Sequence, residues 1–146
     1  MNLAIKTCTL DMPYTDMLDF CVEQGVSAVE IGTGNWSGAP HIDLEEMMSS
    51  ETARQRWYDE ILRRGLELCA LNCSGNPLID TPMGHEHSKT MRDTMVLAGK
   101  LGVDTVVTMS GLPAGAPGDK TPNWFVSTVS WPDFDGFSYM KEGVKY

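Results

Sequence analysis

The segment that decides the fold is Val26–Gly34, VSAVEIGTG. It follows Gly25, which ends a predicted helix, and it reads as a buried apolar strand with Glu30 in its middle. Strands of parallel sheets are covered on both faces and are usually continuous hydrophobic runs. A carboxylate inside such a strand has to be desolvated, paired or used. Glu30 is therefore the first candidate for a functional residue.

The pattern of a helix-ending glycine followed by a short apolar strand occurs three times. Glycine is favoured at this position because it adopts the left-handed conformation that closes a helix. The three copies are Gly25–Ile31, Gly65–Leu71 and Gly102–Thr108. An additional strand is predicted at the start of the chain, and helices with apolar faces precede the glycines. The predicted strands are 3–10, 26–31, 66–73 and 103–109, and the predicted helices are 16–24, 51–64 and 87–101.

Long loops rich in Gly, Pro, Ser and Asn follow three of the predicted strands. They are Thr33–Pro40, Ser74–Gly84 and Ser110–Asp119. Each helix-to-strand turn, in contrast, is a single glycine. The acidic run Asp43–Glu46 in addition resembles a capping box that starts a short, solvated helical turn. In parallel α/β folds the loops at the carboxyl ends of the strands build the site, and right-handed crossovers bring them to one rim.

Two architectures fit this βα repetition, an open doubly wound sheet and half of a (β/α)8 barrel. The polar residues Lys6, Glu30 and Asn72 lie at similar depth in three successive strands, as in a barrel interior. The chain contains neither G-x-G-x-x-G nor a P-loop, which removes the usual support for an open nucleotide-binding sheet. We predict an α/β fold, the N-terminal half of a (β/α)8 TIM barrel with parallel strands in the order 1-2-3-4.

Length and charge limit the possible functions. A complete barrel typically needs about 250 residues, and this chain has 146, with a formal net charge of −9. We expect one partial barrel domain, with βα units over 1–119 and an aromatic tail over 120–146 that packs against something. The acidic charge argues against nucleic acid and anionic membranes as partners. Without a membrane-length apolar run or a signal peptide, the expected location is cytoplasmic.

The chain has four cysteines, Cys8, Cys21, Cys69 and Cys73. Three of them fall in predicted strands, where cysteine usually behaves as a small buried hydrophobe. We expect structural thiols, and a metal site or a disulfide is the alternative.

Three stretches carry a resemblance to a known family. They are VEIGTGNWSGAPH (Val29–His41), LNCSGNPL (Leu71–Leu78) and the run from Lys89–Asp93 through LAGKLGVDTVV (Leu97–Val107). In these stretches the chain resembles the xylose-isomerase-like superfamily, and within it the sugar phosphate isomerase/epimerase group. The resemblance extends from the first strand to the loop after the fourth.

The resemblance implies a (β/α)8 barrel that binds a divalent cation, Mn, Mg or Zn, and isomerises or epimerises sugars or related polyols by proton transfer. The metal ligands of that family, a Glu, Asp, His, Glu set, come from strands of the C-terminal half. This chain has no residues there, so we assign it no catalytic residue and no metal ligand. Alone it is expected to be inactive unless another polypeptide supplies the rest.

Each candidate substrate-binding residue also has a structural interpretation. Glu30 lies near the substrate or pairs with Lys6 on the neighbouring strand. Asn72 binds a sugar hydroxyl or caps the loop Ser74–Pro77. Trp36 and His41 follow the second strand, where an indole stacks on a sugar or plugs the core.

Further candidates follow the third and fourth strands. His85 and His87 flank Glu86; at i, i+2 the two imidazoles do not share a helix face. A ligand role is therefore kept for His85 alone, with a surface histidine as the alternative. Ser110 and Gly111 end the fourth strand, where the resembled family brings backbone close to the ligand.

Two function classes remain open. The first is a partial metal-dependent sugar or sugar phosphate isomerase or epimerase that acts on a small sugar or polyol. The second is a binding or structural module, a half-barrel that forms a homo-oligomer or pairs with a complementary half-barrel. Unpaired edge strands invite such association.

Overall fold

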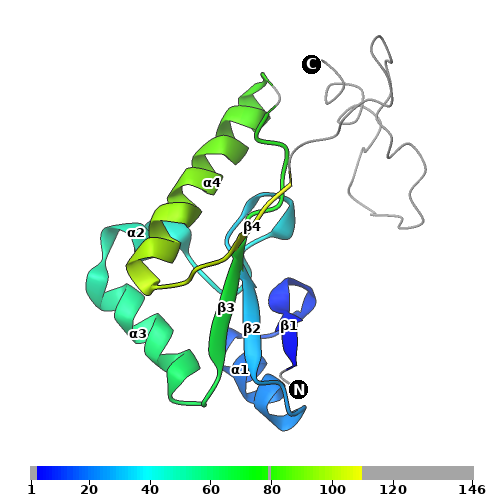
Figure 1. Ribbon diagram of the computed structural model, residues 1–146, viewed down its shortest axis with the longest axis vertical. Coiled ribbons are helices and arrows are strands. Elements are labelled where there is room, and N and C mark those ends of the chain that lie inside the picture. The colour runs from blue at the N-terminus through cyan, green and yellow to red at the C-terminus, as the bar shows by residue number, and fades with distance from the viewer. Residues whose placement is uncertain (1–2, 79, 110–146) are drawn as a thin grey trace, which may run out of the picture.

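Four parallel strands form one sheet in the order β1-β2-β3-β4, which confirms the predicted fold class. The computed structural model describes residues 3–78 and 80–109. The elements are β1 (Ala4–Lys6), η1 (Thr7–Thr9), α1 (Tyr14–Glu23), β2 (Ala28–Gly32), η2 (Asn35–Ser37), α2 (Leu44–Ser49), α3 (Glu51–Leu62), β3 (Glu67–Asn72), α4 (Pro82–Leu101) and β4 (Val106–Val107). Consecutive strands are joined through helices, as in half of a (β/α)8 barrel (Figure 1). The predicted aromatic tail over 120–146 lies outside the described residues.

The strand register aligns the polar positions of the sheet. Lys6 lies opposite Glu30 in the β1–β2 ladder. In the β2–β3 ladder Glu30 lies opposite Ala70, and Asn72 lies two residues further along, opposite Gly32. The sequence predicted a similar depth in the sheet for Lys6, Glu30 and Asn72. In the structure Asn72 lies nearer to the carboxyl end of the strands than the other two.

The β2–β3 ladder contains one irregularity. Val29 pairs with Leu68, but the next residue of β2, Glu30, pairs with Ala70. Cys69 is therefore an extra residue in β3, as in a β-bulge. Its thiol donates to the Val29 carbonyl at 3.3 Å, which keeps the extra residue attached to the neighbouring strand.

The hydrophobic core lies between the helices and one face of the sheet. It includes fully buried residues from every layer, Leu18 of α1, Ile31 of β2, Ile61 of α3, Leu71 of β3 and Leu97 of α4. Burying such a side chain contributes about 1.5–3 kcal/mol. The other sheet face carries small and polar residues that are absent from this core. They are Ala4, Lys6, Ala28, Glu30, Ala70 and Asn72.

Local signals explain where most helices begin and end. The side chains of Asp43 and Ser50 cap α2 and α3 by accepting from the amides of Glu46 and Ala53, at 2.9 and 3.1 Å. The predicted helix start at Asp43 is therefore confirmed, with Asp43 as the capping residue, and the acidic residues of this turn are exposed. The three predicted helix-ending glycines all have φ between 70° and 72°, the left-handed region that suits glycine. They are Gly25, Gly65 and Gly102.

Three elements have a boundary that differs from the prediction by three residues or more. The first strand ends at Lys6, not residue 10, because Thr7–Thr9 form η1, with the Thr7 hydroxyl donating to the Glu30 carbonyl at 3.2 Å. The fourth strand shortens to Val106–Val107. The helix expected from residue 87 begins at Pro82, because Thr81 caps it and proline suits the first helical position. The loop after β3 is therefore shorter than predicted.

The four cysteines are free thiols, so the disulfide alternative is not formed. Cys21 and Cys73 are buried, and burial raises the pKa of both thiols. Cys8 lies in η1, not in a strand. Across the described ranges, no helix combines the length and apolar character needed to span a membrane.

Candidate functional site

The carboxyl ends of β2 and β3 hold a hydrogen-bonded group that we call the rim cluster: Glu30, Ser37, Asn72 and Ser74. Nδ2 of Asn72 donates to Oε1 of Glu30 at 2.6 Å. Oδ1 of Asn72 accepts from the Ser74 amide at 2.9 Å and from the Ser37 hydroxyl. Asn72 is only 2% exposed, so these bonds are largely shielded from water. The predicted loop-capping interpretation of Asn72 is thereby confirmed, while its contact with a sugar stays a prediction.

Glu30 is half-buried and its carboxylate points to β3. Lys6 lies opposite it in the ladder, yet among residues 3–78 and 80–109 no ion pair joins the two side chains. Lys6 is exposed, and Glu30 accepts from Asn72 instead. The predicted structural partner of Glu30 was therefore wrong, and a carboxylate held by a neutral amide keeps acceptor capacity for a further donor.

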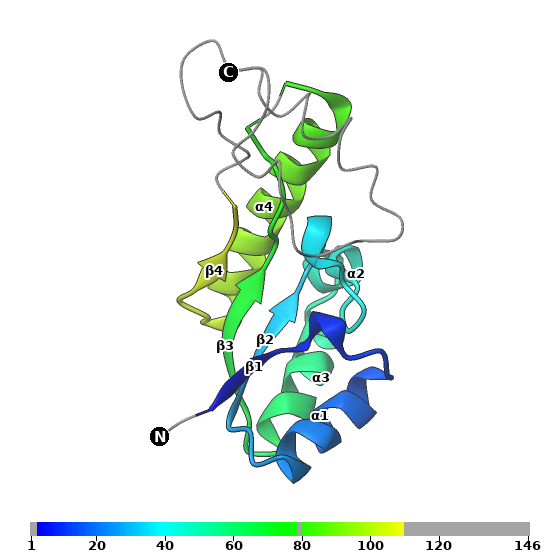
Figure 2. The same cartoon turned by 90° about the vertical axis from the view of Figure 1, so that its right-hand side faces the viewer.

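The loop after β2 has an unusual backbone that brings η2 over the end of β3. Gly34 has φ 144° and Asn35 has φ 56°, both positive. The amides of Thr33 and Trp36 donate to the carbonyls of Asn72 and Ser74, each at 2.8 Å. Hydrogen bonds therefore attach the loop after β2 to the end of β3 and the residues that follow it. Figure 2 shows that the loops after β2 and β3 begin at the same end of the sheet.

Asn35 and Gly75 determine how closely α4 packs on these loops. Nδ2 of Asn35 donates to the carbonyls of Cys73 and His87, at 2.9 and 3.2 Å. A Cβ at Gly75 would lie 2.8 Å from Nδ1 of His87 and 2.9 Å from Cβ of Asn35. Only glycine therefore fits at this contact between two loops and a helix.

His87 lies at the meeting point of these loops. Its Nδ1 accepts from the backbone N–H of Asn76 at 2.9 Å. Its ring and the ring of Trp36 meet in a T-shaped arrangement, with 5.4 Å between ring centroids. His87 is 7% exposed, and burial lowers its pKa, which the carboxylate of Glu86 partly offsets. We expect a neutral imidazole at the carboxyl edge of the sheet.

His85 faces away from this site. Its imidazole is 72% exposed, and Nε2 lies 3.0 Å from the exposed carboxylate of Asp80. The structure therefore supports the interpretation of His85 as a surface histidine. His87, two residues on, occupies the buried position.

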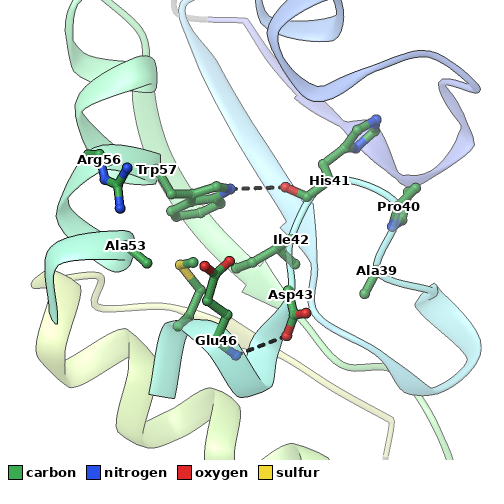
Figure 3. A pocket seen from close by; sticks show the side chains of 10 residues that line it. Ala39, Pro40, His41, Ile42, Asp43, Glu46, Ala53, Arg56 and Trp57 are labelled. Atoms are coloured by element: carbon green, nitrogen blue, oxygen red, sulfur yellow. Dashed lines mark hydrogen bonds between the residues drawn. The ribbon is translucent and has the colours of Figure 1, made fainter. Parts of the chain in front are cut away.

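His41 lies apart from the rim cluster, on the side of α3. Its Nε2 donates to the Met12 carbonyl at 3.2 Å, and its own carbonyl accepts from Nε1 of Trp57 at 2.9 Å. It borders a cavity of about 470 Å³ whose lining includes Glu46 and Arg56. Figure 3 shows its imidazole pointing away from Glu46. His41 thus connects the loop to α3 and the chain near Met12.

The structure therefore divides the predicted site residues. Glu30, Trp36 and Asn72 lie on neighbouring parts of the rim, whereas His41 and His85 are apart. The predicted residues Ser110 and Gly111 lie outside the described residues. Sequence reasoning missed four residues of the rim that make its contacts, Asn35, Ser37, Asn76 and His87. The pair Thr81–Pro82, a helix-start signal, would have placed His87 in the second turn of a helix.

The rim does not supply a metal site by itself. In the part of the chain that the structure describes, no three His, Cys, Asp or Glu side chains are close enough to hold a metal ion. Glu30 also has an amide, not another ligand type, as its partner. We therefore derive no chemical step through a metal from these residues.

Comparisons with known proteins support the fold and leave the activity open. No family model matches the chain. The chain is 47% identical over 147 residues to the uncharacterized protein YfiH of Bacillus subtilis (strain 168), a match that includes 99% of the chain and 47% of YfiH. It thus spans about half the length of the curated relative it matches.

A solved structure resembles the chain in fold. It is the crystal structure of the probable 3-DHS dehydratase AsbF involved in the petrobactin synthesis from Bacillus anthracis. The match has a TM-score of 0.54 and 14% identity, and it covers 77% of this chain and 39% of that one. At this identity the match shows the fold alone.

Proposed function

We propose that the chain is the N-terminal half of a cytoplasmic, xylose-isomerase-like sugar or sugar phosphate isomerase or epimerase. The rim cluster is the observation that carries the proposal. A half-buried carboxylate and a buried amide meet at the carboxyl ends of two adjacent parallel strands, where α/β folds bind their ligands. Hydroxyl groups of a sugar both donate and accept hydrogen bonds, so they suit a carboxylate acceptor beside an amide.

The motifs of the loops after β2 and β3 add to this support. The resemblance to the isomerase/epimerase group falls on Val29–His41 and Leu71–Leu78, and these segments contribute all four residues of the rim cluster. In this proposal the Mn, Mg or Zn ligands and the proton-transferring groups belong to a C-terminal half. The present chain contributes substrate contacts.

Proton transfer beside a carbonyl provides the test, because it exchanges carbon-bound hydrogen with solvent. The chain is mixed with the part of YfiH that it does not match, in D₂O with Mn²⁺, Mg²⁺ or Zn²⁺ and a panel of aldoses, ketoses and their phosphates. Proton NMR should show deuterium incorporation with both polypeptides and none with the chain alone. Asn72→Leu should slow incorporation about tenfold or more, the effect of losing about 1.4 kcal/mol of binding in the transition state.

The control variant is Glu45→Gln, which removes an exposed carboxylate on α2 and should leave the exchange rate unchanged. Failure of the two polypeptides to associate would contradict the proposal. A stable complex that leaves every sugar unlabelled would contradict the isomerase assignment and favour the binding module.

The binding module remains the second candidate because β1 and β4 lie at the two edges of the described sheet, and edge strands can pair with another chain. β1 has three residues and β4 has two, and Leu3 beside β1 is 51% exposed. Here the occupant of the sheet edge is a second copy or a complementary half-barrel. Sedimentation velocity should then show a dimer of the isolated chain, and a monomer at all concentrations would contradict self-pairing.

A further inference from the structure

We propose that His87 is a substrate-facing hydrogen-bond donor, a neutral imidazole with its proton fixed on Nε2 that polarises a carbonyl or hydroxyl oxygen of a polyol. This inference rests on the proposed function and assigns one more residue to the same site. It depends on two observations: Nδ1 of His87 accepts a hydrogen bond, and Nε2 of His87 makes none within the described residues.

The contact at Nδ1 determines where the proton is. The Asn76 N–H donates to Nδ1 at 2.9 Å, so Nδ1 must present a lone pair and carry no proton. A neutral imidazole has one N–H, which is then on Nε2. Protonating Nδ1 would direct two N–H groups at each other, so the same contact also disfavours the imidazolium.

The ring is held in position by three neighbours. Asn35 donates to the His87 carbonyl at 3.2 Å, Trp36 packs against the ring in a T-shaped pair, and Gly75 lets the loop after β3 approach Nδ1. A ring that cannot rotate presents its Nε2–H in one direction, and fixed donors are the ones that stabilise developing charge most effectively.

Nε2 is the nitrogen that remains for a ligand. Within the described ranges it makes no hydrogen bond, and it is not among the ring nitrogens that are both buried and unpartnered. The contrast is His41, whose Nε2 donates to Met12 and whose Nδ1 is buried without a partner. His87 therefore has a donor at the surface of the rim, and His41 does not.

Asn76 supplies a second, independent indication of a ligand at this position. Its side chain is fully buried, and neither Oδ1 nor Nδ2 has a hydrogen-bond partner in the described part of the chain. Burying an amide without partners is costly, and such groups are rare in native proteins. Among the residues described, the Asn76 amide therefore lacks partners of the kind that the hydroxyl groups of a polar ligand supply.

Imidazole ¹⁵N NMR tests the proton position without any activity measurement. The chain has three histidines, so ¹⁵N-histidine labelling gives three rings, and the spectrum of His87→Asn assigns one of them. At neutral pH the His87 ring should show a protonated Nε2 and an unprotonated Nδ1. A protonated Nδ1 or an imidazolium would overturn the inference, whatever the activity.

Titration with D-fructose and D-fructose 6-phosphate tests the ligand contact. At least one of the two should shift the His87 Nε2 signal. His87→Asn keeps an acceptor for the Asn76 amide but lacks the Nε2 donor, so it should fold normally and bind the ketose about tenfold more weakly. The matched control is His85→Asn, on the exposed side of the same helix, which should bind as the wild type does.

The outcomes separate this inference from the function it rests on. Ketose binding that shifts the backbone amides of the rim cluster but not His87 Nε2, or that His87→Asn leaves unchanged, overturns the inference and keeps the proposed function. If neither ketose binds at the rim, the inference fails, and the deuterium exchange measured with both polypeptides decides the proposed function separately.

Discussion

Nδ2 of Asn72 donates to Oε1 of Glu30 at 2.6 Å, although the two residues are not opposite each other in the sheet. Glu30 lies opposite Ala70 and Asn72 lies opposite Gly32, so the bond runs diagonally between β2 and β3. It is a charge-assisted hydrogen bond, a class that is about twice as strong as a neutral one. This bond also holds the carboxylate of Glu30 toward the carboxyl end of the sheet.

Glu30→Gln should change the free energy of unfolding by less than about 1 kcal/mol, because the amide oxygen of glutamine still accepts from Asn72. Asn72→Asp should cost about 1–3 kcal/mol at neutral pH, since it sets two carboxylates against each other. The cost should shrink in acid, where the two carboxyl groups share a proton. Urea denaturation at neutral and acid pH measures both effects. A loss of several kcal/mol in Glu30→Gln would show that the fold depends on the negative charge of Glu30 and not only on its hydrogen bond with Asn72.

Gly75→Ala should destabilise the chain by about 1–3 kcal/mol, because the new methyl group overlaps His87 and Asn35 and forces the loop away from α4. Gly99→Ala is the matched control. A Cβ at Gly99, inside α4, meets nothing within 4 Å, so alanine there should stabilise by up to about 1 kcal/mol. Thermal denaturation of both variants decides the point, and equal midpoints would contradict the close contact at Gly75.

The lowered pKa of His87 makes the stability of the chain depend on pH. Above the ordinary histidine pKa of about 6.5, the folded and unfolded states are both neutral and its contribution is complete. As the pH falls below that value, His87 binds a proton in the unfolded chain but stays neutral in the folded chain. The free energy of unfolding therefore falls until the pH reaches the lowered pKa of His87 in the folded state. His87→Asn should flatten this slope in urea titrations between about pH 7.5 and about pH 5. An unchanged slope would mean that His87 is protonated equally in both states.

Arg64 connects α1 to α3, through Asp19 at 2.5 Å and Glu60 at 2.6 Å. Hydrogen bonds from arginine lower the pKa of both carboxyl groups. Their contribution is therefore present above the ordinary carboxyl pKa and is lost as the pH falls through the lowered values. Arg64→Gln should raise the pKa of Asp19 in an NMR titration, while Arg56→Gln, an exposed control, should not.

The strand order and the helix ends follow from local sequence signals. The glycines at 25, 65 and 102 all adopt the predicted left-handed conformation, because the backbone requirement at a helix end is local. The position of the rim also followed from the sequence, since long polar loops alternate with one-residue turns. The hydrogen bond between Glu30 and Asn72 was not predicted, because it depends on the register between two strands.

The histidines show where sequence reasoning fell short. With a helix beginning at 87, His85 is a loop residue close to the strands. With the helix beginning at Pro82, His85 lies on its exposed side and His87 on its buried side. A change of five residues in one helix start thus exchanged the two candidates. Thr81, which caps α4, is the residue that indicates the earlier helix start.

The extra residue in β3, Cys69, determines which side chains reach the rim. Side chains alternate between sheet faces, yet Leu68 and Leu71, three positions apart, both belong to the core. The added residue exchanges the two faces, so that Leu71 turns inward to the helices and Asn72 turns to the opposite side. If Cys69 paired in the ladder as an ordinary residue, strict alternation from Leu68 would turn the amide of Asn72 toward the core and Leu71 away from it. The bulge at Cys69 therefore sets the sheet face of every later residue of β3, whereas deleting the codon of Cys69 would remove the bulge and leave Leu71 and Asn72 on the faces that they now occupy.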